Sequence, residues 1–192
     1  MAGLLSVGVF LTTLIFSLIL FVLWVQVILR YYRVSLLHPV SLAVYRITSP
    51  VMGPIARRVS GNKKRPPRYD WVCLGFIVLI EFLKFLLLGW LTYQIVIPFA
   101  YLMLFVLADL IVQPCNLLFY ALLIRVILSW VNPQWRLHPA AGVLTLVTDP
   151  LILLGRKIIP DISGFDFAPF IIMIILKVIT LFISANMPLP LV

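Results

Sequence analysis

The first 29 residues carry no charged side chain, and this uninterrupted apolar stretch is the feature that most constrains the fold. A helix needs about 20 apolar residues to cross the hydrocarbon core of a bilayer, so this segment is long enough to span one. The whole chain of 192 residues is 64% hydrophobic and only 11% charged, which excludes an ordinary soluble domain. Its first positive charge, Arg30, follows the apolar stretch, whereas signal peptides begin with basic residues. We therefore expect a retained span and not a cleaved signal peptide.

Three more apolar stretches follow, at about residues 71–92, within 99–131 and at about 167–185. The predicted fold class is all-α: a polytopic membrane protein with four transmembrane helices. The third stretch would be roughly 50 Å long as one helix, well beyond the hydrocarbon thickness. Two geometries remain open for it. It is either one long helix that tilts or kinks at Pro114, or a short interfacial helix near residues 97–110 followed by the span.

The distribution of positive charge predicts the orientation in the membrane. Nine of the fifteen Lys and Arg residues lie between residues 30 and 68, and three more, Arg136, Arg156 and Lys157, lie between 131 and 164. By the positive-inside rule, both basic loops face the cytoplasm and both termini face outside. The net charge of +9 then indicates contact with anionic lipid headgroups. Nucleic acid is not an expected partner, because the basic run "GNKKRPPR" is short, lacks interleaved aromatic residues and adjoins the spans.

The chain contains an internal repeat. The stretch "LHPVSLAVYRITSP" at residues 37–50 matches "LHPAAGVLTLVTDP" at residues 137–150 at five of fourteen positions, where chance would give about one. The predicted copies are residues 1–96 and 97–192, each a span, a cytoplasmic loop and a second span. Because both copies start outside, they are parallel repeats forming two hairpins, related by an axis along the membrane normal.

Each repeated loop starts with a proline that suits the first turn of a helix. About ten residues later, a polar residue and a second proline predict the capped start of another short helix. The residues concerned are Pro39, Thr48, Ser49 and Pro50 in the first copy and Pro139, Thr148, Asp149 and Pro150 in the second. That second helix would end in basic residues, Arg57 and Arg58 or Arg156 and Lys157, beside the headgroups. These interfacial helices are either packed connections or a surface for a partner.

Charged residues also occur inside the spans. Glu81 and Lys84 are three residues apart, so they share a helix face and can pair. Lys177 occupies the repeat position of Glu81 and would lie at similar depth, facing a common interior. A charge at mid-bilayer costs at least about 2.5–3.5 kcal/mol, which makes this cluster a candidate functional site. The alternatives are a structural ion-pair lock between helices and an ion or proton path.

Other polar residues lie nearer the ends of the third predicted span. Asp109 falls toward its outer side, and Arg125 falls close to its cytoplasmic end, where we expect it to anchor the loop that follows. Ser129 and Trp130 would lie at the interface, a depth that tryptophan favours. In the first copy, Gln26 stands at the position of Arg125.

The sequence contains no motif for catalysis. His38 and His138 precede helix-starting prolines without other ligands at metal-binding spacing, so we interpret them as caps or interfacial polar groups. Cys73 and Cys115 lie in separate apolar stretches and are expected to pack as small hydrophobic residues. No glycine-rich phosphate loop, H-E-x-x-H or G-x-S-x-G pattern is present. We expect no enzymatic activity and no cofactor or metal ion.

Three stretches in the second copy resemble the bacterial YggT family of small integral membrane proteins. They are "IRVILSWVNP" at residues 124–133, "LVTDPLILLGRKIIP" at 146–160 and "GFDFAP" at 164–169. The family positions they carry are Arg125, Ser129, Trp130, Thr148, Asp149, Pro150, Arg156, Pro160, Asp166 and Pro169. The first copy departs from this pattern, with Gln26 for the arginine, Ser49 for the aspartate and a longer basic loop. The second loop is therefore the better candidate for a partner site.

The resemblance implies a multi-pass protein of the bacterial inner membrane. Members of the family are linked with envelope assembly, cell division or osmotic tolerance, and plastid relatives with membrane-complex biogenesis. We accordingly expect a non-enzymatic assembly or scaffolding factor whose partners are lipids, other membrane or membrane-associated proteins, or further copies of itself. The alternative is ion or small-solute transport through the Glu81, Lys84 and Lys177 cluster, in support of osmotic tolerance.

Overall fold

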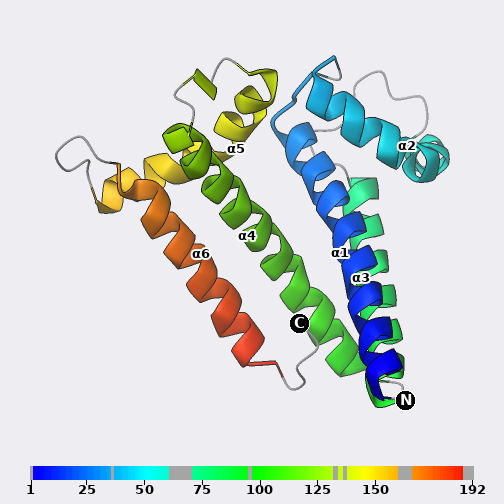
Figure 1. The fold of residues 1–192 in the computed structure, drawn as a ribbon. Coiled ribbons are helices and arrows are strands. Elements are labelled where there is room, and N and C mark those ends of the chain that lie inside the picture. The colour runs from blue at the N-terminus through cyan, green and yellow to red at the C-terminus, as the bar shows by residue number, and fades with distance from the viewer. Residues whose placement is uncertain are drawn as a thin grey trace.

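The computed structural model describes residues 2–35, 37–60, 71–94, 97–131, 134–135, 138–159 and 166–187. These residues form helices and turns and no strand. The six main helices, shown in Figure 1, are α1 (Ala2–Tyr31), α2 (Pro39–Ser60), α3 (Trp71–Tyr93), α4 (Phe99–Val131), α5 (Pro139–Ile158) and α6 (Ala168–Ala185). Pro160 and the side chains of Arg57 and Arg58, three of the predicted loop residues, lie outside the described part of the chain.

Four helices, α1, α3, α4 and α6, are long and apolar enough to cross a membrane, with mean hydropathies between 2.0 and 2.5. They coincide with the four predicted spans, so the all-α membrane class is confirmed. The long third span is one helix of 33 residues with Pro114 inside it. The alternative of a separate interfacial helix at residues 97–110 is wrong.

Helices α2 and α5 lie across the same end of the four spans (Figure 1). Each is a single continuous helix, so the prediction of two short helices in each loop is wrong. Pro150 lies inside α5 and removes one backbone hydrogen bond without ending the helix, which changes direction along its length (Figure 1). The expected cap, Asp149, does not start a new helix: it lies inside α5, and its carboxylate is bound by Arg125. Pro39 and Pro139 do begin α2 and α5, as predicted.

The spans pack as two pairs, α1 with α3 and α4 with α6, and the pairs meet through α3 and α4. Three hydrophobic clusters fill these contacts. Leu20, Leu23, Cys73 and Ile77 lie between α1 and α3; Leu122, Val126, Ile172 and Leu176 lie between α4 and α6; Phe85, Leu102, Phe105 and Val106 lie between α3 and α4. Helices α1 and α4 diverge toward the end that carries α2 and α5 (Figure 1).

The outward faces of the spans are apolar. Phe10 and Leu18 on α1, Leu107 and Ile111 on α4, and Phe182 on α6 are all half exposed or more. A soluble protein rarely leaves such continuous apolar surface open, whereas lipid chains cover it at no cost. The packing thus places polar contacts in two regions only partly reachable by lipid: the junction of α3 with α4, and the helices at the end of the spans.

Candidate functional site

A buried charge cluster joins the two pairs of spans. Glu81 and Lys84 extend from α3, and Asp109 extends from α4; their exposed fractions are 0%, 4% and 1%. The Lys84 ammonium lies 3.0 Å from Glu81 Oε2 and forms a second ion pair with Asp109. Glu81 and Lys84 therefore pair as their spacing predicts. Asp109 completes the cluster. The sequence alone did not indicate which residue it pairs with.

The surroundings of the cluster are mostly aromatic and apolar. The Lys84 ammonium lies 4.4 Å from the centre of the Phe85 ring, which stacks on Phe105. Gln113 Nε2 donates to Asp109 Oδ2 at 3.3 Å. Among the described residues, Asp109 Oδ1 has no hydrogen-bond partner. Two carboxylates share one ammonium, so the cluster carries one excess negative charge when both carboxyl groups are ionised.

Lys177 is not part of this cluster, which corrects the predicted grouping of Glu81, Lys84 and Lys177. Its side chain is exposed on α6, with the ammonium 5.6 Å from the centre of the Phe119 ring of α4. Equivalent positions in the two copies do not meet, because α6 packs on α4 and α5 whereas α3 packs on α1 and α4. The third charged residue of the cluster is therefore Asp109, and not Lys177 as the repeat pattern suggested.

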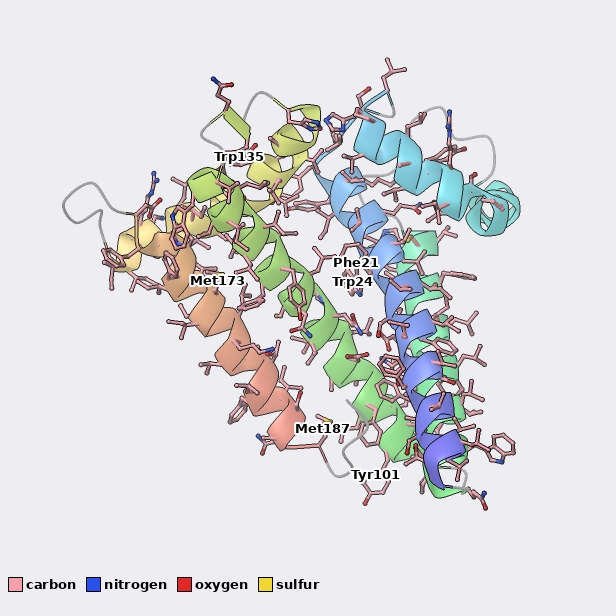
Figure 2. The ribbon with its side chains drawn as sticks, in the orientation of Figure 1. Phe21, Trp24, Tyr101, Trp135, Met173 and Met187 are labelled. Carbon is pink, nitrogen blue, oxygen red and sulfur yellow. The ribbon has the colours of Figure 1, made fainter. Side chains whose placement is uncertain are left out.

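A groove of about 420 Å³, mostly apolar but with several polar residues in its wall, opens beside the cluster, between α1 and α4. Its polar lining residues include Thr13, Ser17, Lys84, Asp109, Gln113 and Asn116. Phe21 and Trp24 of α1 lie in the space facing α4 (Figure 2). This groove was missed from the sequence. A signal was present, since Asp109, Gln113 and Asn116 recur at the four- and three-residue spacing of one helix face.

A second polar site fixes α5 to α4. Arg125 Nη1 donates to Thr148 Oγ1 and to Asp149 Oδ1, both at 2.6 Å. The Thr148 hydroxyl is fully buried and donates to the carbonyl oxygen of Leu144, so it acts as donor and acceptor at once. Arg125 thus anchors the loop helix to the span, in the role that its sequence position predicts.

The end of α5 is fixed to the start of α6. Arg156 Nη2 donates to Asp166 Oδ2 at 2.6 Å, and Asp166 Oδ1 accepts the backbone N–H of Ala168 at 3.0 Å. The two helices approach closely at Gly155, where an added Cβ would lie 2.9 Å from the carbonyl oxygen of Ala168. Both residues of the predicted basic pair are exposed, but the charge of Arg156 is paired with Asp166.

The first copy has different contacts at the equivalent positions. Gln26 replaces Arg125, and its side-chain oxygen is buried without a hydrogen-bond partner among the described residues. Thr48 donates to the carbonyl oxygen of Val44, as Thr148 does within its own helix, but no arginine donates to it. The Ser49 hydroxyl donates back to its own helix, to the carbonyl oxygen of Arg46. Among the described residues, the contact of Arg125 with Thr148 therefore has no counterpart at Gln26 and Thr48.

The remaining predicted residues lie at the ends of helices. His38 Nδ1 accepts the backbone N–H of Val40 at 3.4 Å and caps α2, whereas His138 precedes α5 without a side-chain capping bond. The Ser129 hydroxyl donates within α4, to Val126. Trp130 is 63% exposed beside Phe170, and its depth at the membrane interface stays a prediction. No group of three potential metal ligands occurs in the described parts of the chain.

Four apolar spans in two copies of one arrangement, with polar contacts buried between them, define a polytopic α-helical membrane protein built by duplication. The CCB3/YggT family model matches residues 5–91 and again residues 101–187. The chain belongs to this family, and the double match agrees with the internal repeat found in the sequence.

Relatives in several bacteria match most of the chain. An uncharacterized protein of Pseudomonas aeruginosa is 27% identical over 97% of this chain and 93% of its own. An uncharacterized protein encoded in the proC 3′ region of Vibrio alginolyticus is 33% identical over 86% of each chain. The uncharacterized protein YggT of Escherichia coli K12 is 27% identical over 94% of each chain. No solved structure matches significantly.

Proposed function

We propose that this protein is a non-enzymatic assembly or scaffolding factor of the bacterial inner membrane, and that α5 binds a partner membrane protein. The observation that carries this proposal is that α5 is fixed at two places yet keeps an exposed apolar surface. Arg125 fixes its middle and Arg156 its end, while Leu153, Leu154 and Ile158 are each more than half exposed. A surface fixed before binding loses little conformational entropy when a partner docks.

The chemistry of α5 indicates the kind of partner it would take. Leu153 and Ile158 lie near the exposed Lys157, so an apolar helix face that carries an acidic residue would be complementary. We place α5 on the cytoplasmic side, because the basic segments of the chain adjoin α2 and α5. Anionic lipid headgroups at that depth would compete for Lys157.

Charge reversal of Lys157 tests the partner surface. Lys157→Glu should lower recovery of a co-purifying membrane protein roughly fivefold, about 1 kcal/mol, because it sets like charges against each other. Arg46→Glu on α2 is the matched control, since Arg46 is also an exposed basic residue on a loop helix. Arg156 is unsuitable because its reversal would also break the Asp166 pair. Equal losses from both variants, or none, would contradict a specific surface on α5.

The topology has a separate test. A cysteine placed at residue 64 in the basic loop, in a chain whose Cys73 and Cys115 are replaced by serine, should react with an impermeant reagent only after the cytoplasmic side is opened. Reaction from the outside of intact cells would reverse the orientation and place α5 away from any cytoplasmic partner.

Ion or small-solute transport is the second candidate function. The buried Glu81, Lys84 and Asp109 cluster beside the groove favours it, because charges at membrane depth commonly mark solute paths. Purified protein in liposomes would then move an ion, and Glu81→Gln would abolish that flux. Asp149→Asn is the control, since Asp149 lies outside the cluster. Flux that disappears only in Glu81→Gln would favour transport and overturn the scaffolding proposal.

A further inference from the structure

Lys177 is a cation on the outer surface of a membrane span. It lies in the middle of the 18-residue helix α6, where its neighbours Ile174 and Val178 are 62% and 57% exposed. No carboxylate in the described parts of the chain pairs with Lys177, and its ammonium rests against the ring of Phe119. A charged side chain facing lipid at this depth is unfavourable and is expected to find a partner.

The groove between α1 and α4 has the complementary charge. The cluster beside it holds two carboxylates and one ammonium, and Asp109 contributes directly to the groove wall. Asp109 is 1% exposed, and its Oδ1 atom has no hydrogen-bond partner among the described residues. The cluster thus holds two carboxyl groups against one ammonium, and Asp109 Oδ1 is the acceptor that a cation entering the groove would bind.

The two features lie at similar depth. Lys177 is eight residues from the end of α6, Asp109 is ten from the start of α4, and Lys84 is nine from the end of α3. At 1.5 Å per residue, all three lie about 12–15 Å from the ends of their helices. Those ends adjoin one another, because Met187, just after α6, packs against the cluster of Phe85, Leu102 and Phe105.

We propose that two copies of this chain associate in the membrane, with Lys177 of one copy entering the α1–α4 groove of the other to pair with Asp109. Copies inserted in the same orientation keep both partners at the same depth, so rotation about the membrane normal forms a pair or a closed ring. In this pairing the Lys177 ammonium donates to Asp109 Oδ1, the carboxylate oxygen that has no partner among the described residues. This inference stands apart from the partner proposed for α5.

Co-purification of two differently tagged copies tests this pairing. Lys177→Gln in both copies should lower recovery of the second tag at least tenfold, the change expected for losing one strong polar contact between membrane helices. Lys177→Arg keeps the charge and should retain recovery. Ser17→Phe, which fills the groove from α1 without removing an ion-pair member, should lower recovery similarly.

Co-expression of two different variants distinguishes loss of this contact from a general loss of stability. A Lys177→Gln copy still has an open groove, and a Ser17→Phe copy still has its lysine, so co-expressing them should restore one contact and much of the recovery. Unchanged recovery in Lys177→Gln, or no recovery in the mixed pair, would overturn the proposal. The thermal stability of each solubilised variant should equal that of the unmodified chain.

A photo-crosslinking residue at Val178 gives an independent reading of the same contact. Adducts should form with peptides from α1 or α4 of an isotope-labelled second copy. Adducts confined to lipid or to a different protein would contradict the pairing.

Discussion

The two copies of the repeat share the order span, loop helix, span, but they differ in how the loop helix is fixed. In the second copy, Arg125 bonds to Thr148 and Asp149, and Arg156 bonds to Asp166. In the first copy, Gln26 stands where the arginine would be, and its side-chain oxygen is unpaired among the described residues. Duplication has therefore preserved the pairing of spans, whereas among the described residues the arginine contact to the middle of the loop helix occurs in the second copy.

The largest predicted effect concerns the Glu81, Lys84 and Asp109 cluster, which joins the two copies of the repeat within one chain. Lys84→Met leaves Glu81 and Asp109 buried without their cation, which should destabilise the fold by about 3–5 kcal/mol. The measurement is thermal unfolding in detergent micelles. The double variant Lys84→Met/Asp109→Leu should recover part of the loss, since it removes one unpaired charge. If Lys84→Met alone is as stable as the unmodified chain, the cluster does not hold the two repeats together.

Removing the anchor of α5 is expected to make the second copy resemble the first. Arg125→Gln should cost about 1–2 kcal/mol, less than a fully buried pair because Asp149 is 55% exposed. Hydrogen exchange of the α5 amides should accelerate while exchange in α2 stays the same. The converse variant, Gln26→Arg with Ser49→Asp, should slow exchange in α2. If α5 exchanges no faster without the arginine, the contrast between the copies does not depend on this contact.

Matched glycine substitutions test the close approach of α5 to α6. Gly155→Ala should destabilise by about 1 kcal/mol, because the new Cβ would lie 2.9 Å from backbone and side-chain atoms of Ala168. Gly53→Ala in α2 meets nothing within 4 Å and should stabilise by about 0.5–1 kcal/mol through helix propensity. Thermal unfolding of both proteins gives the sign of each change in stability. If both substitutions stabilise the protein, α5 does not require a glycine at residue 155.

The smallest effect is expected at the surface pair. Arg156 and Asp166 are 47% and 30% exposed, so Arg156→Gln should cost only about 0.2–1 kcal/mol. The loss should shrink further in high salt, which screens exposed charges. A loss as large as that of Arg125→Gln, measured by the same hydrogen exchange, would mean that the end of α5 carries more of the anchoring than its middle.

The sequence predicts the spans well because each is a long apolar stretch between polar ones. The predicted 71–92 and 167–185 spans match α3 and α6 to within one or two residues. It does not predict which face of each span meets which neighbour. Asp109, Gln113 and Asn116 share one side of α4, but the sequence does not indicate that this side meets Lys84, and repeat equivalence wrongly suggested Lys177 instead. The continuity of the loop helices was missed because proline inside a helix is usually a stop, yet α2 and α5 both continue past their internal prolines, Pro50 and Pro150.

Parallel photo-crosslinking in cells from one exposed residue on each loop helix tests the central claim most directly. Leu153 on α5 is 58% exposed and Ile47 on α2 is 64% exposed, so both can accept the probe without disturbing the core. The account predicts a defined protein adduct from Leu153 that is weaker in Lys157→Glu, and no such adduct from Ile47. The same adducts from both positions, or lipid adducts alone from Leu153, would contradict a partner surface specific to the second copy.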